Sequence, residues 1–296
     1  MAYPKSKYAG GSPLQLLAAG PGYRVWDMRC SLGPSDPVRE NCYPAYRVAA
    51  IVGGTFQIRS TLGTAVPVVG SLLLGNAGDC YCCRHDTPHG DRCINFDYEA
   101  DFLEHVRAEL GVRGLGERFR RALIPPSRQS VALAAAMEAV EEGSDTCALQ
   151  EAAFEIAAAA LTQTHATVAL GRKSSFRHER AVMRAARYID TRYNESCSLA
   201  ELAEQAGMSP FHFLRVYRRV TGQTPHRHVL TTRLRHAARR LRISSDRIVD
   251  IALEVGFGDL SHFNASFVSY FGVSPGAYRT SRHSHGPPVP DVASTL

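Results

Sequence analysis

Two related stretches of sequence decide the fold of the C-terminal third of the chain: 199-LAELAEQAGMSPFHFLRVYRRVTGQTP-225 and 248-IVDIALEVGFGDLSHFNASFVSYFGVSP-275. They are two copies of one pattern, about fifty residues apart, with an alanine, two glycines and a proline in matching places. Such a repeat indicates one supersecondary unit that is used twice. The matching pairs are Ala203 and Ala252, Gly207 and Gly256, Gly222 and Gly272, and Pro225 and Pro275.

Each copy has the residues that two short, closely crossing helices need. The alanine is small enough for the helices to touch, and the first glycine lets the turn between them take a positive φ. Ser198 with Glu201 predicts a capping box, and Ser209 before Pro210 predicts the start of the next helix. Apolar residues at helical spacing then bury one face of that helix and leave the other free: Phe213, Val216 and Tyr217 in the first copy, and Phe263, Phe267 and Tyr270 in the second.

A long helix is predicted between the two copies, over residues 224–242. Its arginines and its apolar side together form a basic, amphipathic rod. Such a rod suits two recognition helices that enter consecutive major grooves, about 34 Å apart. It also suits a membrane surface, but the repeat on both sides favours DNA. The arginines are Arg233, Arg235, Arg239, Arg240 and Arg242.

The positive charge of the chain is confined to this region. Residues 177–282 contain 17 arginines, no lysine and nine acidic residues, a net charge of +8, whereas residues 1–176 have a net charge of −1. A region that neutralises DNA phosphates is expected to have this bias. An arginine-rich solvated surface is the alternative that charge alone leaves open.

Residues 178–282 resemble the DNA-binding domain of the AraC/XylS family of transcription regulators. The closing pattern 256-GFGDLSHFNASF-267 and 271-FGVSPGAYR-279 carries the resemblance together with the repeat. The resemblance implies base contacts from the first recognition helix, with Arg215 suited to guanine, and phosphate contacts near its start and end. The implied contact residues are Pro210, Phe211, Leu214 and Arg215 for bases, and Ser209, Arg218 and Arg219 for phosphates.

The second copy departs from the family pattern. An arginine usually follows the position of Asn264, but this chain has Ala265 there. We therefore expect the second half to contribute less base readout and more shape or phosphate contact. Its implied contact residues are Leu260, Ser261, His262 and Asn264.

The N-terminal half predicts a different kind of domain, so the fold class is α+β with two domains. Residues 1–110 predict a β-rich sandwich or barrel, cupin-like, with strands at 46–52, 56–61, 68–74 and 94–98. Residues 111–165 predict a helical hairpin, with Ala-rich helices over 131–140 and 148–161, which serves either dimerisation or internal packing. Residues 166–177 predict a linker and residues 283–296 a flexible tail. The family resemblance implies that this half senses an effector or makes a dimer.

A dense group of cysteines and histidines lies in the β-rich region, 80-CYCCRHDTPHGDRC-93. If residues 80–85 are extended, Cys83 and His85 share one face, and a turn brings His89 and Cys93 back to them. Two thiolates and two imidazoles would suit zinc or another thiophilic metal. Cys80 and Cys82 are alternate ligands, with Cys30 and Cys42 as further candidates. A thiol redox sensor remains open, and so do incidental buried cysteines, because a free cysteine packs like a small hydrophobic residue. Disulfides are a poor default for a cytoplasmic chain.

Other functions are weighed against a regulator. Two histidines with Asp86 or Asp91 could serve a non-haem iron oxygenase, but the surrounding cysteines favour a closed site. A DNA alkyl-transfer repair protein would need paired cysteines with another spacing. No export signal or apolar run of membrane-spanning length is seen, so a cytoplasmic location is expected. We expect a transcription regulator and not an enzyme. It is expected to bind double-stranded DNA as a homodimer and to contact RNA polymerase as an activator. Its expected effector is a metal, a thiol reagent or a small organic molecule.

Overall fold

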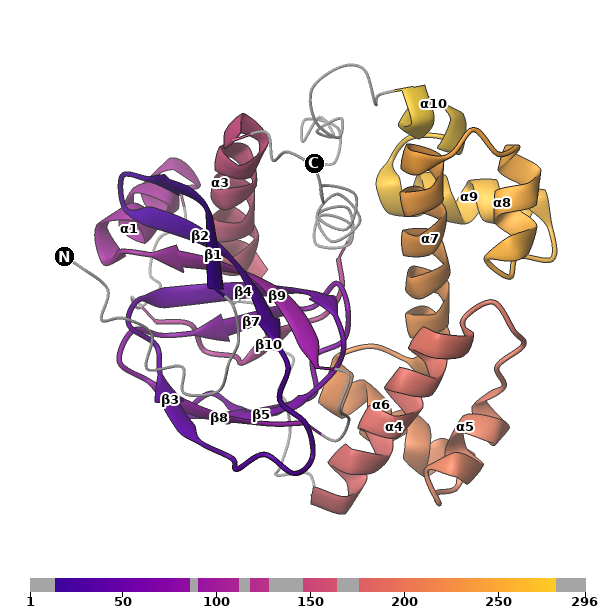
Figure 1. The fold of residues 1–296 in the computed structure, drawn as a ribbon, viewed down its shortest axis with the longest axis horizontal. Coiled ribbons are helices and arrows are strands. Elements are labelled where there is room, and N and C mark those ends of the chain that lie inside the picture. Colours follow the sequence, from indigo (N-terminus) through magenta and orange to yellow (C-terminus); the bar gives the residue numbers. More distant parts are fainter. Residues whose placement is uncertain (1–13, 86–89, 112–117, 128–145, 164–175, 281–296) are drawn as a thin grey trace.

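The computed structural model describes residues 14–85, 90–111, 118–127, 146–163 and 176–280, whose arrangement is shown in Figure 1. A β-rich N-terminal domain precedes an all-helical C-terminal domain. The N-terminal domain contains two antiparallel sheets. The larger has the order β1 (Leu14–Gly20), β2 (Tyr23–Cys30), β9 (Asp91–Tyr98), β4 (Tyr46–Gly53), β7 (Leu72–Gly75) and β10 (Leu123–Ile124), and the smaller has the order β3 (Glu40–Cys42), β8 (Cys80–Arg84), β5 (Gln57–Ser60) and β6 (Gly63–Ala65).

The six-stranded sheet is covered on both faces. Helices α1 (Ala100–Glu109) and α3 (Thr146–Gln163) pack on one face, where the Tyr98 hydroxyl donates a hydrogen bond to the Ala153 carbonyl at 2.7 Å. The four-stranded sheet packs on the other, with Ile51 and Ile58 in the shared core. Because both of their faces are covered, β4 and β9 are buried along most of their length.

The predicted β-rich sandwich is confirmed, and three of the four predicted strands match β4, β5 and β9. The strand predicted over 68–74 begins only at Leu72, because a tight turn precedes it in which the Ser71 amide donates to the Val68 carbonyl. The strands β1, β2, β3, β6 and β8 were not among those predicted. The cupin-like assignment stays a prediction.

The structure changes the interpretation of residues 111–165. Strand β10 lies within this range and pairs with β7, and α3 packs into the core of the N-terminal domain. Alanines that were predicted to serve a hairpin or a dimer are buried here, among them Ala153, Ala157 and Ala160. The N-terminal domain therefore continues through α3. The helix predicted over 131–140, most of the predicted linker and the tail lie outside the described residues.

The C-terminal domain is built around one long helix. α7 (Pro225–Ile243) confirms the helix predicted over 224–242 and lies between two helical units (Figure 1). One unit comprises α4 (Phe176–Arg192), α5 (Leu199–Gln205) and α6 (Pro210–Thr221); the other comprises α8 (Ile248–Glu254), α9 (Leu260–Phe271) and α10 (Pro275–Thr280). Each unit has its own apolar core, and α7 contributes Val229 to one and Leu234 to the other.

The two domains share part of a core. Val66 and Val68, which flank the end of β6, are fully buried against α4, α5 and α6. The Val66 amide donates to the carbonyl of Val220 in α6 at 3.3 Å. Gln57 of β5 donates a hydrogen bond to the buried Glu179 of α4. The N-terminal domain thus contacts both the first helix and the first recognition helix of the C-terminal domain.

Candidate nucleic-acid interface and the cysteine cluster

The first helix-turn-helix unit has the local geometry that its sequence predicts. The Ser198 hydroxyl accepts from the Glu201 amide at 3.2 Å, and the Glu201 carboxylate accepts from the Ser198 amide at 2.9 Å, which completes the capping box. Gly207 takes the positive φ of the turn, +65°. The Ser209 hydroxyl then caps α6 by accepting from the His212 amide. These contacts fix the direction in which α6 leaves the turn.

Helix α6 presents an exposed face that faces away from its apolar core. Phe211 is 74% exposed, and Arg215 is exposed one turn further along. Leu214 is half-buried between them. Arg219 is half-buried, and its charge lowers the pKa of the buried Glu179 at the domain junction, which opposes the larger effect of burial. The remaining predicted contact residues of this helix are exposed: Ser209, Pro210 and Arg218.

The second unit begins its recognition helix with a residue that the sequence analysis missed. The Asp259 carboxylate accepts from the amides of Ser261 and His262 at 3.0 and 2.8 Å, and these hydrogen bonds lower its pKa. An aspartate just before an apolar helix start is a cap signal that could have identified it. Gly256, at φ +95°, packs against the backbone of Asn194. Of the other positions on α9, Leu260 and Ala265 are exposed and Asn264 is half-buried.

Part of the positive charge of α7 has a structural use. The Arg233 guanidinium donates to the backbone carbonyls of Tyr193 and Glu195 at 2.6 and 2.9 Å. Arg240 pairs with Asp246 at 2.7 Å, and Arg235 is buried. These arginines join the long helix to its neighbours, so the net charge overstates the number of arginines that are free for phosphates.

Helix α7 also contains a neutral histidine. The His236 ring stacks on Tyr193, with ring centroids 3.9 Å apart and planes 4° apart. Burial and the positive charge of Arg235 lower the pKa of His236 to about 3. The stack therefore contains an uncharged imidazole at neutral pH.

Comparisons with known proteins match the helical domain. A family model described as a helix-turn-helix domain matches residues 202–281. The HTH-type transcriptional activator AarP of Providencia stuartii is 30% identical over 94 residues, which are 32% of this chain and 70% of AarP. This chain belongs to the AraC/XylS family of transcriptional regulators. Its AraC-type domain makes it a DNA-binding protein, and no described helix is long and apolar enough to cross a membrane.

Other matches of the AraC-type domain cover small parts of longer proteins. HTH-type transcriptional regulator Rv1931c of Mycobacterium tuberculosis is 41% identical over 81 residues, which are 27% of this chain and 31% of that protein. Most of the first curated relatives are thus matched over only about a third of their length. The DNA-binding domain of AdpA, solved in complex with a target DNA, is 28% identical, covers 36% of this chain and 98% of its own, and has a TM-score of 0.34.

The N-terminal domain of this AraC-type chain gathers cysteine, histidine and aspartate side chains at one end of the sandwich. Cys30 ends β2 and lies opposite Asp91, the first residue of β9. His85, which follows β8, places Nε2 2.7 Å from Asp91 Oδ1 and 3.5 Å from Cys30 Sγ. Cys93 Sγ lies 3.6 Å from Asp91 Oδ2. His85, Asp91 and Cys93 are buried, so the group lies inside the fold, between the two sheets.

Two glycines allow the close packing around this group. A side chain at Gly90 would meet the Cys30 carbonyl oxygen at 1.9 Å, and Gly90 also has a positive φ of +67°. Gly54, at φ +75°, approaches the Gly90 carbonyl in the same way. The strands that carry the group are therefore held at a distance that only glycine permits at these positions.

The predicted ligand set is only partly brought together. His85 and Cys93 belong to the cluster, and Cys83 lies near enough for its charge to affect the pKa of Cys93. His89 lies outside the described residues. Cys30, which was a further candidate, and Asp91, which was not a predicted ligand of this site, are in the cluster. The Gly-Asp-Arg-Cys sequence contained the signal for Asp91, whereas the place of Cys30 depends on strand pairing.

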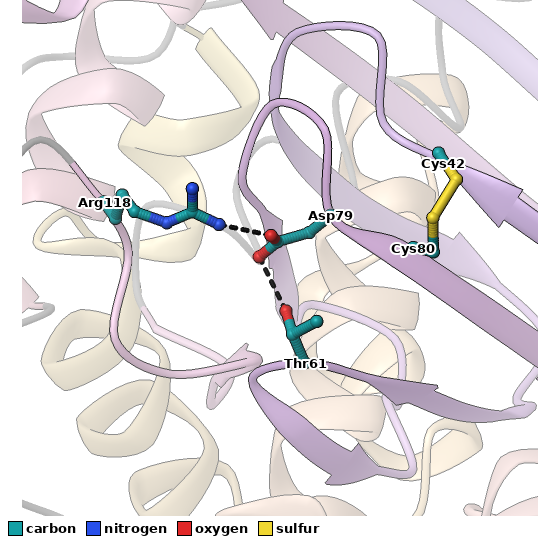
Figure 2. Close-up of a disulfide and its surroundings, with 5 residues drawn as sticks. All are labelled: Cys42, Thr61, Asp79, Cys80 and Arg118. Carbon is teal, nitrogen blue, oxygen red and sulfur yellow. Dashed lines mark hydrogen bonds and ion pairs between the residues drawn. A yellow bond between two sulfur atoms is a disulfide. The ribbon is translucent and has the colours of Figure 1, made fainter.

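Cys80 is excluded as a ligand because it forms a disulfide with Cys42, as Figure 2 shows. The two residues are direct partners in the β3–β8 ladder, which places their sulfur atoms side by side. Disulfides are a poor default for a cytoplasmic chain, but this chain has one here. Cys82, the other alternate, lies next to Cys83 along β8 and so points to the opposite face of the strand.

Residue Asp79 supports the turn before the disulfide. Its carboxylate accepts from the Thr61 hydroxyl at 2.6 Å and pairs with Arg118, as drawn in Figure 2. These contacts join the β5–β6 turn and the segment before β10 to the start of β8.

The protonation of the cluster follows from its contacts. Burial lowers the pKa of His85, but the hydrogen bonds with Asp91 and Cys30 and the negative charge of Asp91 raise it to about 9. Burial and the charge of Asp91 raise the pKa of the Cys93 thiol. Without a further cation, the imidazole is protonated at neutral pH and the buried thiol keeps its proton, which makes Cys93 a poor nucleophile.

Proposed function

We propose that this chain is a sequence-specific transcriptional activator whose N-terminal domain senses an effector. The single observation that carries sequence recognition is the exposed face of α6, where Phe211 and Arg215 project beyond a buried core. An arginine can read guanine in the major groove through two hydrogen bonds, and an apolar side chain can contact a thymine methyl group. The capped start of α6 supports phosphate contact there.

The proposed signal passes through the domain junction. Val66 contacts Val220 at the end of α6, and Gln57 contacts Glu179 at the start of α4. An effector that moves β5 or β6 would therefore shift the first recognition helix relative to the second. Such coupling is typically worth about 1–3 kcal/mol.

Activation, dimerisation and contact with RNA polymerase belong to the same proposal. The relative AarP is named a transcriptional activator, and we extend that role to this chain. We propose a homodimer because two copies of a DNA-binding domain with two unequal recognition helices would double the length of operator that is recognised. Sedimentation of the full chain with and without operator DNA tests the dimer, and transcription with purified polymerase tests activation.

The test of sequence recognition compares the two recognition helices. The operator is selected from random DNA with the full chain, and binding is then measured for Arg215→Ala and Asn264→Ala. We expect Arg215→Ala to cost about 1–3 kcal/mol at one base pair and to relax specificity there. Asn264→Ala is expected to weaken binding less and without a change in sequence preference.

Arg187→Ala is the matched control for that test. Arg187 is exposed on α4 and lies outside both recognition helices, so its loss should leave the ranking of DNA sequences unchanged. Equal loss of specificity from Arg215→Ala and Asn264→Ala would refute the unequal roles of the two halves. Failure of the wild-type chain to select any sequence would refute the proposed function.

A further inference from the structure

We propose that Cys30, His85, Asp91 and Cys93 form a binding site for one divalent transition-metal ion of the zinc type. One ligand atom each from Cys30, His85 and Asp91 already lies within 4.8 Å of the other two. Cys93 lies outside this group of three, but its sulfur is 3.6 Å from the second oxygen of Asp91, and a small movement of its side chain toward the ion would supply the fourth ligand. This inference goes beyond DNA recognition and does not rest on it.

Three of the four ligand atoms already lie close enough together to share one ion. Bonds of about 2.0–2.3 Å to zinc place neighbouring ligand atoms roughly 3.3–3.8 Å apart. The distance of 3.5 Å between Cys30 Sγ and His85 Nε2 fits this range. Cys93 Sγ lies 3.6 Å from Asp91 Oδ2, whereas His85 contacts Oδ1, so Cys93 must move toward the ion to join the set. The distance of 2.7 Å between His85 and Asp91 is that of a hydrogen bond and must open by roughly 1 Å.

The ligand types also select the ion. Two thiolates, an imidazole and a carboxylate suit zinc or cobalt and disfavour magnesium and calcium, which prefer oxygen ligands alone. On binding, the metal displaces the proton that His85 donates to Asp91, and this proton and those of the Cys30 and Cys93 thiols are released to solvent. No oxidation or reduction is involved.

The position of the cluster gives the ion a route of entry and a structural effect. A cavity of about 330 Å³ adjoins it, lined by residues 32–34 and 36–38, by Cys83, Arg84 and His85, and by Arg180 of α4. The ligands come from β2 and β9 of one sheet and from the end of β8 of the other. A bound ion would therefore join the two sheets beside the first helix of the DNA-binding domain.

The experiment measures metal binding by the full chain with its disulfide intact. Chelator-treated protein is titrated with Co²⁺ and then with Zn²⁺ in competition with a chromophoric chelator. We expect one ion per chain and a thiolate-to-cobalt charge-transfer absorption that zinc abolishes. Cys30→Ser and Asp91→Asn should each weaken binding by at least about tenfold, and Cys30→Ser should also reduce the charge-transfer band.

Control variants and tests of folding distinguish the loss of this metal site from the loss of other thiols and from misfolding. Cys82→Ser alters a neighbouring cysteine on the opposite face of β8 and should bind the ion as wild type does. The double variant Cys42→Ser/Cys80→Ser should keep one ion, because its cysteines are not ligands. Far-ultraviolet circular dichroism and operator binding by each variant show whether the chain is folded.

The result that overturns the inference is a folded wild-type chain that binds neither ion, which would leave the cluster a buried ion pair only. Equal affinity in wild type and Cys30→Ser, or loss of the ion in Cys42→Ser/Cys80→Ser, would overturn it as well. Metal binding that fails while operator binding persists rejects the site and keeps the regulator. The reverse result rejects the regulator and keeps the site.

Discussion

At the scale of single residues, the same residue type serves different purposes within one helix. Arg239 of α7 is exposed, whereas Arg233 donates to backbone carbonyls and Arg235 is buried. Beside them His236 is neutral in its stack on Tyr193. The composition gives only the number of these side chains. The packing of α7 against its neighbours shows which arginines hold the fold together and which face solvent.

His236 makes the DNA-binding domain sensitive to acid. Its pKa is about 3 in the folded state and about 6.5 in an unfolded chain, so protonation favours unfolding. The stability that this group contributes is present above pH 6.5 and is lost as the pH falls from about 6.5 towards 3. His236→Phe keeps an aromatic ring and removes the titration, so urea unfolding should show a smaller loss between pH 6.5 and pH 4.

The exposed His226 provides the comparison, since His226→Phe should unfold with the wild-type dependence on pH. A His236→Phe variant whose stability falls with pH as steeply as that of wild type would show that this imidazole is not responsible.

At the scale of elements, local signals and distant pairings differ in how far sequence predicts them. The capping box at Ser198, the turn at Gly207 and the long helix α7 depend on residues within a few positions of one another, and all three were predicted. The pairing of Cys42 with Cys80 depends on the register of β3 and β8, which no local pattern encodes. The same holds for Cys30, which reaches the cluster through the pairing of β2 with β9.

The predicted candidate site was correspondingly incomplete. His85 and Cys93 were identified from a short, chemically dense segment, whereas Cys30 comes from more than fifty residues earlier in the chain. Asp91 was in view but was assigned to a different kind of site. Strand β1 lacks β-branched residues, so its membership of the sheet follows from pairing with β2 and not from its own propensity.

The disulfide should stabilise the β3–β8 ladder. It closes a sequence separation of 38 residues, which corresponds to roughly 4 kcal/mol of lost unfolded-state entropy at most. We expect Cys42→Ser/Cys80→Ser to lower the free energy of unfolding of the N-terminal domain by roughly 2–4 kcal/mol in urea.

A reducing agent provides the matched condition for this measurement. It should destabilise wild type by a similar amount and leave Cys42→Ser/Cys80→Ser unchanged. A wild-type chain that is equally stable with and without reductant would contradict a stabilising disulfide.

At the scale of the whole molecule, the two domains are joined by both apolar and polar contacts. Val66 and Val68 complete the core of the first helix-turn-helix unit, and Gln57 satisfies the buried Glu179. Burial raises the pKa of Glu179, against the effects of Gln57 and of the nearby arginines. The stability of the junction therefore depends on the hydrogen bond that Gln57 donates to this buried carboxylate.

Loss of that hydrogen bond should loosen the junction. Gln57→Ala leaves a buried carboxylate without its amide partner, which typically costs about 1–3 kcal/mol. We expect faster hydrogen exchange at the first turns of α4 and in β5, measured by mass spectrometry of the full chain.

The exposed Gln15 on β1 offers a control, because Gln15→Ala removes an amide far from the junction. Exchange in α4 that is the same in Gln57→Ala and Gln15→Ala would show that the hydrogen bond does not hold the domains together.

The valines at the end of β6 bear on how this regulator can be divided. A fragment that begins at α4 would contain every described helix of the DNA-binding domain. It would nevertheless expose the apolar surface of the first helix-turn-helix unit that Val66 and Val68 cover. Uncovered apolar surface of this kind promotes self-association. An isolated DNA-binding domain, or a chimera with another sensor domain, must therefore include residues that cover this apolar surface in place of Val66 and Val68. Alternatively, the residues of that surface can be replaced with polar ones.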